Sequence, residues 1–331
     1  MKTISQKAIL LVLALTLASC GLAVSTEERM QEAQASMEAG EYRGAVIQLR
    51  NVLVDEPDHI EARLALAKVL IGLGDLPTAE KELQRAVELG APALDIERVH
   101  FSLLEAQGDF RELLAGLARD EIVLPEDEQL GLRGEALLGL REGAAAEETF
   151  RELLALSPDL PSAGVGLAKA RALQGEPEEA ISLLEDVIAT DETNPDAWLA
   201  LGNIHYGLQN YEGAAIAFRE SLASKLIETD ANAHLFALLG LSDSELMLGD
   251  ATAARGTVSR LSAFAPGMAE TLLQRARVYQ LEGDYVAAGR ELIELHNAAP
   301  DDMRILMMLA TVQWRAGNIY QAQEYLSRVV A

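Results

Sequence analysis

The sequence is poor in cysteine, aromatic residues and positive charge. Its 331 residues include one cysteine, Cys20, so no internal disulfide can form and stability must come from packing. Aromatic residues make up 5% of the chain although 50% of it is hydrophobic, a balance that favours helices with small side chains at close contacts. Lysine and arginine number 27 against 52 acidic residues, and a net charge of −25 repels nucleic acid and anionic lipid. We therefore expect no nucleic-acid partner.

The sequence also lacks any pattern of catalytic or cofactor-binding residues. It has no Gly-Lys-Ser/Thr phosphate loop, and the GVG at 164–166 is not followed by the third glycine of a dinucleotide-binding loop. Acidic runs such as 176–179 and 300–302 lie at expected helix starts, where negative charge offsets the helix dipole. No histidine has a second histidine three or four residues away, and we expect surface or helix-end roles for His59, His100, His205, His234 and His296. The sequence predicts no enzyme activity, no cofactor and no metal.

Only the N-terminus carries a long apolar run. Lys2 and Lys7 precede the apolar residues 8–18, which as a helix reach about half of a ~30 Å hydrocarbon core. This pattern indicates a secretory signal and not a membrane span. The run ends in the tetrapeptide LASC (17–20), which resembles the bacterial lipobox, where the cysteine thiol is acylated and the leader is removed just before it.

We therefore expect a lipoprotein signal peptide at 1–19, then lipidated Cys20 and a short tether at 20–25. More than one acyl chain gives stable anchoring to a membrane. The alternative is an ordinary signal peptide with an incidental cysteine. Because Gly21 and not aspartate follows Cys20, resemblance to proteobacterial lipoproteins favours the outer over the inner membrane. The expected location is the envelope, facing the periplasm.

The rest of the chain, 26–331, is built on a repeat of about 34 residues. Counting within each copy, position 15 is glycine in seven copies: Gly40, Gly74, Gly108, Gly175, Gly249, Gly283 and Gly317. Position 20 is alanine in eight: Ala45, Ala79, Ala146, Ala180, Ala214, Ala254, Ala288 and Ala322. This pattern is typical of the tetratricopeptide repeat (TPR).

The repeat predicts an all-α fold, a TPR alpha-alpha superhelical solenoid of about nine helix pairs. Glycine at position 15 ends the first helix of a pair, alanine at position 20 lets the two helices approach, and leucine or phenylalanine at position 24 fills the gap. An insertion at 224–232 predicts altered curvature or an exposed loop, with neutral drift as the alternative. The copies start near Thr26, Ile60, Leu94, Asp127, Pro161, Pro195, Leu235, Ala269 and Met303.

The stretch 45–91 carries more than the generic repeat. With the lipobox upstream, it resembles the TPR-repeat lipoprotein of the PEP-CTERM/exosortase system, a family associated with exopolysaccharide-producing Gram-negative bacteria. The irregular third copy, LLEAQGDFRELLAGL (103–117) followed by LRGEALLGL (132–140), is similar to that family too. The resemblance implies a scaffold for cell-surface polymer or protein sorting, and it brings no catalytic residues.

In TPR folds, partners bind the concave wall, which the first helices form with positions 2, 5, 9, 12 and 13. Cations there could hold a peptide carboxylate or an acidic glycan. The alternative is that these residues are ordinary solvent-exposed side chains that vary from helix to helix without a binding role. The candidate concave binding surface is Lys68, Arg98, Lys169, Asn203, Tyr206, Arg277, Trp314 and Arg315. Because the chain stops at Ala331 inside a second helix with no polar capping helix, we also expect a partner or a second copy to dock there.

The leading hypothesis for function is a lipid-anchored TPR scaffold for protein partners of an envelope assembly, in exopolysaccharide production or export or in PEP-CTERM protein sorting. The alternative is a periplasmic glycan-binding element that guides a nascent polysaccharide. The low aromatic content disfavours this alternative, because sugar sites favour stacking platforms.

Overall fold

The computed structural model describes residues 25–119 and 121–329, which contain eighteen α-helices, one 3₁₀ helix and no β-strand. The first helices of the successive pairs are α2 (Thr26–Glu38), α4 (Ile60–Gly72), α6 (Ala93–Gln107), α8 (Glu126–Gly139), α10 (Pro161–Leu173), α12 (Pro195–Gly207), α14 (Ala231–Met247), α16 (Ala269–Glu282) and α18 (Met303–Arg315). The second helices are α3 (Tyr42–Asp55), α5 (Leu76–Glu88), α7 (Phe110–Leu117), α9 (Gly143–Leu156), α11 (Pro177–Thr190), α13 (Tyr211–Ser221), α15 (Ala251–Phe264), α17 (Tyr285–Ala298) and α19 (Ile319–Val329). The predicted all-α solenoid is confirmed. The predicted signal peptide and Cys20 lie outside the described residues.

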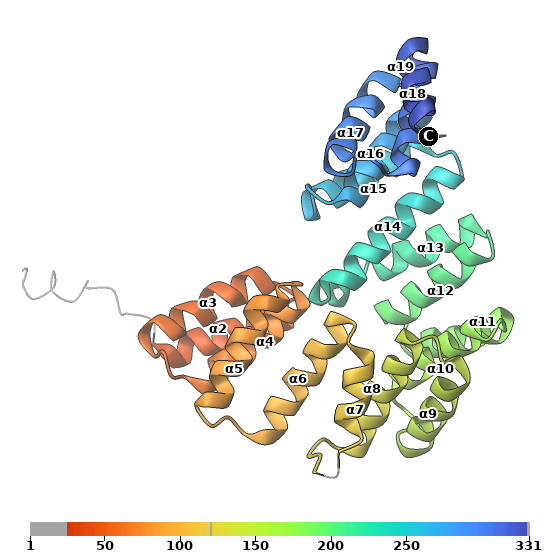
Figure 1. The fold of residues 1–331 in the computed structure, drawn as a ribbon. Helices are drawn as coiled ribbons and strands as arrows, with labels where there is room; N and C mark the ends of the chain where they lie inside the picture. The colour runs from red at the N-terminus through yellow and green to blue at the C-terminus, as the bar shows by residue number, and fades with distance from the viewer. Residues whose placement is uncertain (1–24, 120, 330–331) are drawn as a thin grey trace, which may run out of the picture.

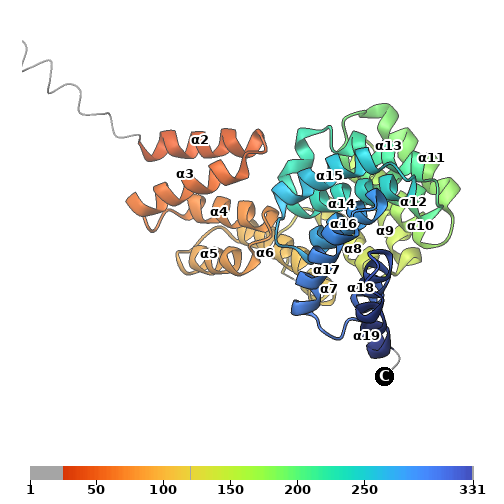
Figure 2. The same cartoon turned by 90° about the horizontal axis from the view of Figure 1, so that it is seen from above.

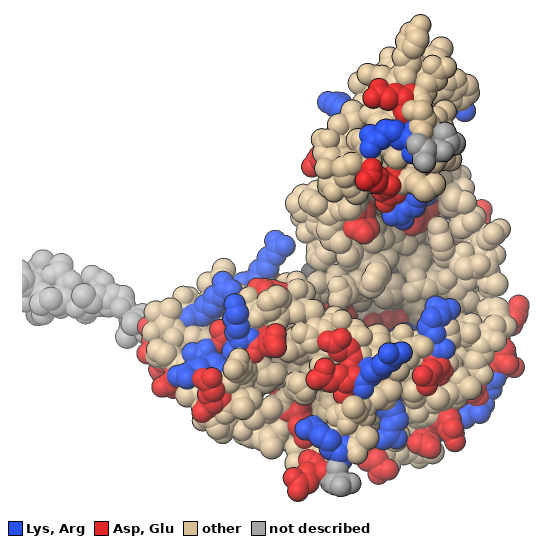
Figure 3. Space-filling view, in the orientation of Figure 1, with Lys and Arg blue, Asp and Glu red and all other residues tan. Residues whose placement is uncertain are grey.

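The helix pairs stack into a curved solenoid that winds around a hollow, with α2 and α3 at one end and α18 and α19 at the other (Figures 1 and 2). First helices of successive pairs pack directly against one another, α4 on α6, α8 on α10, and α12 on α14. The inner side of a curved stack is the shorter side, so these contacts place the first helices on the concave wall. Figure 3 shows the hollow from its open side, with carboxylates visible inside it.

The turn inside each pair depends on a left-handed residue at position 15. In the second pair, Gly74 has φ of 77°, and the amide of Asp75 donates to the carbonyl of Leu70 at 2.9 Å, the bond that closes a helix end of the Schellman type. All seven predicted glycines have positive φ. The two copies without glycine place Arg141 (φ 63°) and Gln209 (φ 60°) in the same conformation, which side chains with a Cβ rarely adopt.

Small residues set the spacing between helices. Alanine at position 20 is fully buried in seven pairs, and Leu113 takes this place in the third pair, also fully buried. Phe218 of α13 fills the gap at position 24 and lies between Gly202 of α12 and Gly240 of α14. A Cβ added at either glycine would meet its ring at 2.7 and 2.5 Å. Phe150 of α9 is enclosed by two glycines in the same way.

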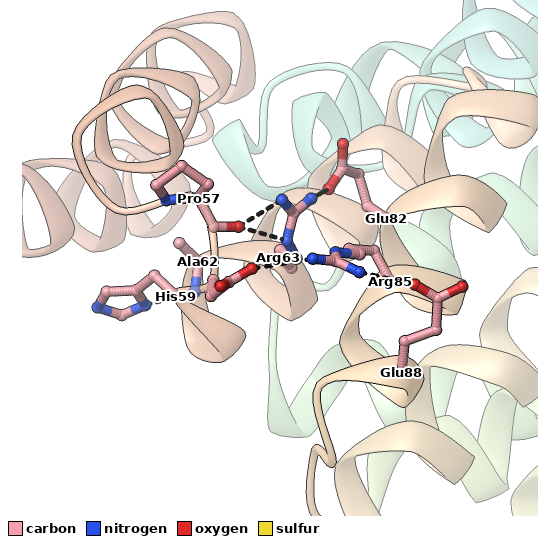
Figure 4. A network of polar contacts seen from close by, with 8 residues as sticks. Pro57, His59, Ala62, Arg63, Glu82, Arg85 and Glu88 are labelled. Atoms are coloured by element: carbon pink, nitrogen blue, oxygen red, sulfur yellow. Dashed lines mark hydrogen bonds and ion pairs between the residues drawn. The ribbon is translucent and has the colours of Figure 1, made fainter.

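A polar network fastens the loop before α4 to the helices that follow (Figure 4). The guanidinium of Arg63 donates to the carbonyl of Pro57 at 3.0 and 2.5 Å and to the carboxylate of Glu82 on α5 at 2.5 Å. The Nδ1 atom of His59 accepts the amide of Ala62 at 3.2 Å and so caps α4. His59 therefore has the helix-end role predicted for it.

The insertion at 224–232 folds against the solenoid. Residues Lys225–Thr229 form the 3₁₀ helix η1, which contacts α12 and α14, and Ile227 is 1% exposed. Asp230 then accepts the amide of Asn232 at 2.8 Å, so α14 begins at Ala231, ahead of the Leu235 expected from the sequence. The expectation of an exposed loop is wrong at Ile227, because this apolar residue is buried between helices.

Candidate partner-binding groove

Four predicted site residues share position 9 of the repeat. Lys68, Lys169, Asn203 and Arg277 lie on α4, α10, α12 and α16, all first helices of their pairs. Two of these cations form ion pairs, each with a carboxylate from the preceding helix pair. Lys169 Nζ lies 3.3 Å from a carboxylate oxygen of Glu135, and Arg277 donates to the carboxylate of Asp243. Charge on this row is therefore partly neutralised between neighbouring repeats.

A third predicted cation, Arg98 on α6, is also paired. Its guanidinium donates to both carboxylate oxygens of Glu128 on α8, at 2.9 and 2.6 Å. These hydrogen bonds lower the pKa of the Glu128 carboxyl and raise the pKa of Arg98. Both side chains are more than a third exposed, so this ion pair contributes little to stability. The guanidinium of Arg98 is nevertheless already paired within the chain.

A pocket of about 680 Å³ opens on the inner wall between α10 and α12. This volume is within the range of roughly 300–1,000 Å³ that ligand pockets have. Its apolar lining includes Leu173 and Leu199, both half-buried, and Leu208, which is 46% exposed. The polar residues of this apolar pocket are Lys169, Asp196 and Asn203.

A second pocket, of about 330 Å³, adjoins the first and is acidic. Glu105 of α6 and Glu135 of α8 line this acidic pocket, together with Phe110. Lys169 and Leu173 line both pockets, so the two open beside each other on the same stretch of the concave wall.

The carboxylates around these pockets outnumber the cations. The pKa of Glu105 is raised to about 7, mainly because protein surrounds the side chain in the hollow, and further because Glu135 and Asp230 are negative. The pKa of Asp196 is also raised, although the residue is exposed, first because neighbouring protein displaces part of the water around its carboxyl group and then by the same two carboxylates. Lys169 acts against both shifts. Lys169 therefore interacts with Glu135, Glu105 and Asp196, and Asp230 adds a further negative charge near the last two.

The remaining predicted residues lie elsewhere. The ring of Tyr206 stacks edge-on against Tyr211 at 5.5 Å, and burial raises the pKa of Tyr206. Trp314 and Arg315 form a cation–π contact of 5.1 Å on α18, where the Trp314 side chain is 59% exposed. Neither these residues nor Lys68 lines either pocket. The structure therefore brings Lys169 and Asn203 into one pocket. Away from both pockets, Lys68 and Arg98 both act on Glu128, and Tyr206 lies within electrostatic range of Arg277.

Sequence reasoning missed the residues that give the pockets their character. Asp196, Leu199, Glu135, Glu105 and Leu173 occupy positions 2, 5, 9, 12 and 13 of their copies. Those are the positions expected to face the groove, but the candidates chosen there were mainly cations. The repeat frame itself was the signal that could have found them.

Within 25–119 and 121–329, no group of three or more histidine, cysteine or acidic side chains is arranged to hold a metal ion. None of the helices that the structure describes combines the length and apolar character that crossing a membrane requires. On α19, Tyr320 is 89% exposed and Ile319 56% exposed. The expected docking of a partner or second copy at α19 stays a prediction.

Comparison with known families and structures identifies the repeat. A tetratricopeptide-repeat model matches residues 36–100 and 171–225, and another matches 132–195. The chain is thus a helical-repeat solenoid, and the matched stretches carry the repeat. In particular, it carries tetratricopeptide repeats, as its sequence period predicted.

This chain is similar to several proteins of low sequence identity. DnaJ homolog subfamily C member 3 of Homo sapiens is 24% identical over 226 residues, which cover 62% of this chain and 44% of that protein. The Cut9–Hcn1 APC/C hetero-tetramer structure matches 87% of this chain and 56% of the other, with a TM-score of 0.60 and 19% identity. Pseudomonas aeruginosa pilF matches 60% of this chain and 88% of its own, with a TM-score of 0.52 and 18% identity. The chain spans about half the length of the relatives and Cut9–Hcn1, and these likenesses concern the fold.

Proposed function

We propose that this chain is a lipid-anchored scaffold of a bacterial envelope that binds partner proteins on the concave wall of its solenoid. The partners belong to an assembly for exopolysaccharide production or export or for PEP-CTERM protein sorting. The observation that carries the binding role is the pair of adjoining pockets at α8, α10 and α12. The envelope setting rests on the lipobox resemblance at Cys20 and on the family resemblance of 45–91.

Photo-crosslinking in cells tests the binding role. A photoreactive residue at Asn203, an exposed position that lines the apolar pocket, is expected to capture a partner protein. The matched control is the same residue at Val286, which is 70% exposed on the second helix α17. Equal capture at the two positions, or capture of polysaccharide without protein at Asn203, would contradict the proposal.

The anchor is tested separately with Cys20→Ser. The wild-type chain is expected to sediment with the membrane fraction and to carry acyl chains on Cys20 by mass spectrometry. Cys20→Ser is expected to leave that fraction, because no acyl chain then holds it. A wild-type chain that carries no lipid would contradict the lipid anchor and leave the groove experiment unaffected.

A further inference from the structure

The two adjoining pockets have different chemistry, and this difference specifies an occupant. We propose that they bind a segment of a partner protein in which apolar side chains stand directly beside a lysine or arginine. The apolar side chains enter the pocket between α10 and α12, and the cation enters the pocket between Glu105 and Glu135. This inference rests on the proposed function, because it names the partner chemistry of the same groove.

The first step concerns the apolar pocket. Leu173, Leu199, Ile204 and Leu208 leave apolar surface open to water there, and Leu208 is nearly half exposed. Covering apolar surface stabilises a complex by about 25 cal/mol for each Å² removed from water. Leucine, methionine and phenylalanine side chains supply such cover.

The second step concerns charge. Glu105 and Glu135 line the same pocket as Lys169. The negative charges of Glu135 and Asp230 act on both Glu105 and Asp196, and Lys169 opposes this effect at both. Lys169 is held by Glu135 at 3.3 Å, so Glu105 and Asp196 are the carboxylates that a second cation would offset. A negative site in a hollow with low-dielectric walls attracts cations and repels anions. The complementary partner group is therefore an ammonium or guanidinium.

The third step joins the two pockets. Lys169 and Leu173 form the boundary between them, so a side chain in one pocket lies beside a side chain in the other. An apolar residue and a basic residue adjacent in a partner sequence satisfy both at once. A segment with aspartate or glutamate beside the apolar residue meets like charge, which selects against it.

The experiment uses the purified full chain and short fluorescein-labelled peptides of equal length in a Gly-Ser background. One peptide carries Leu-Phe-Lys, the second Leu-Phe-Glu and the third Ala-Ala-Lys. Fluorescence anisotropy is expected to show that Leu-Phe-Lys binds at least about tenfold more tightly than either other peptide, or about 1.4 kcal/mol. The Ala-Ala-Lys peptide measures general attraction of a cation to this acidic protein.

Two variants locate the binding. Asp196→Lys reverses an exposed charge of the apolar pocket and is expected to weaken Leu-Phe-Lys binding about tenfold. Glu135→Gln removes one charge of the acidic pocket and is expected to weaken it about fivefold. The matched control is Glu270→Lys, which reverses an exposed acidic residue in the first turn of α16 that lines neither pocket, and is expected to bind like wild type.

The outcomes separate this inference from the proposed function. Equal binding of Leu-Phe-Lys and Leu-Phe-Glu, an equal loss in the Glu270→Lys control, or no binding of any peptide at about 1 mM would overturn the partner chemistry. Capture of a protein at Asn203 would still support the scaffold role in each of these cases. Failure of that capture would overturn the scaffold role itself.

Discussion

Replacing Gly240 with alanine tests the packing that sets the spacing between the sixth and seventh pairs. Gly240 lies in the interior of α14, and Phe218, 1% exposed, faces it from α13. A Cβ at Gly240 would lie 2.5, 2.6 and 2.8 Å from three ring carbons of Phe218. The ring has little room to move away, because it also packs against the backbone of Gly202 on α12, where an added Cβ would lie 2.7 Å from two ring carbons.

The expected change in the free energy of unfolding is the sum of two opposed effects. Alanine favours a helix interior over glycine by about 1 kcal/mol. Overpacking a tight core costs about 1–3 kcal/mol, so the net effect of Gly240→Ala should run from no change to a loss of about 2 kcal/mol. The matched control is Gly256→Ala in α15, where the position is exposed and no atom lies within 4 Å of the added Cβ. That variant should gain about 0.5–1 kcal/mol.

Urea unfolding of the full chain, followed by circular dichroism, measures these changes, and the midpoints are compared between variants of equal slope. A double-mutant cycle with Phe218→Leu isolates the contact. The smaller side chain leaves room for the Cβ, so Gly240→Ala should cost about 1–2 kcal/mol less in the Phe218→Leu background. Additive effects, or a gain of stability in Gly240→Ala equal to that of the control, would refute the close approach.

Three further predictions use the same unfolding assay. Arg141→Gly and Gln209→Gly should each stabilise the chain by about 0.5 kcal/mol, because relief of a left-handed backbone exceeds the entropy that glycine adds to the unfolded chain; a loss in both would contradict it. The folded chain should lose stability as pH rises from about 4.5 to 7, because Glu105 has a pKa of about 7 when folded against 4.5 ordinarily and so holds its proton longer in the folded state. Glu105→Gln should remove this pH dependence and raise the free energy of unfolding above that of wild type by roughly 1–3 kcal/mol at pH 8. An unchanged pH profile in Glu105→Gln would contradict this prediction. Ile227→Ala should cost about 2–4 kcal/mol, since the side chain is 1% exposed, whereas a loss under 0.5 kcal/mol would show that η1 is not anchored.

The sequence by itself determined the helix pairs and their turns. A left-handed residue at Gly74 and a close approach at Ala45 are requirements of single positions, so the residue types that satisfy them recur with the period of the repeat. The numbering of the repeat also predicted which positions face the groove, including those of Glu105 and Leu199. It could not show that Arg141 and Gln209 take the left-handed conformation, because neither residue type signals it.

Only the tertiary structure decided which groove residues meet. The contact of Lys169 with Glu135, and the opening of two pockets on either side of it, depend on how far each helix pair is rotated relative to the last. The burial of Ile227 depends on the gap between α12 and α14 in the same way. Small rotations accumulate along a stack, and no single repeat encodes their sum. The binding surface is therefore a property of the assembled solenoid, whereas the helix pair is a property of the local sequence.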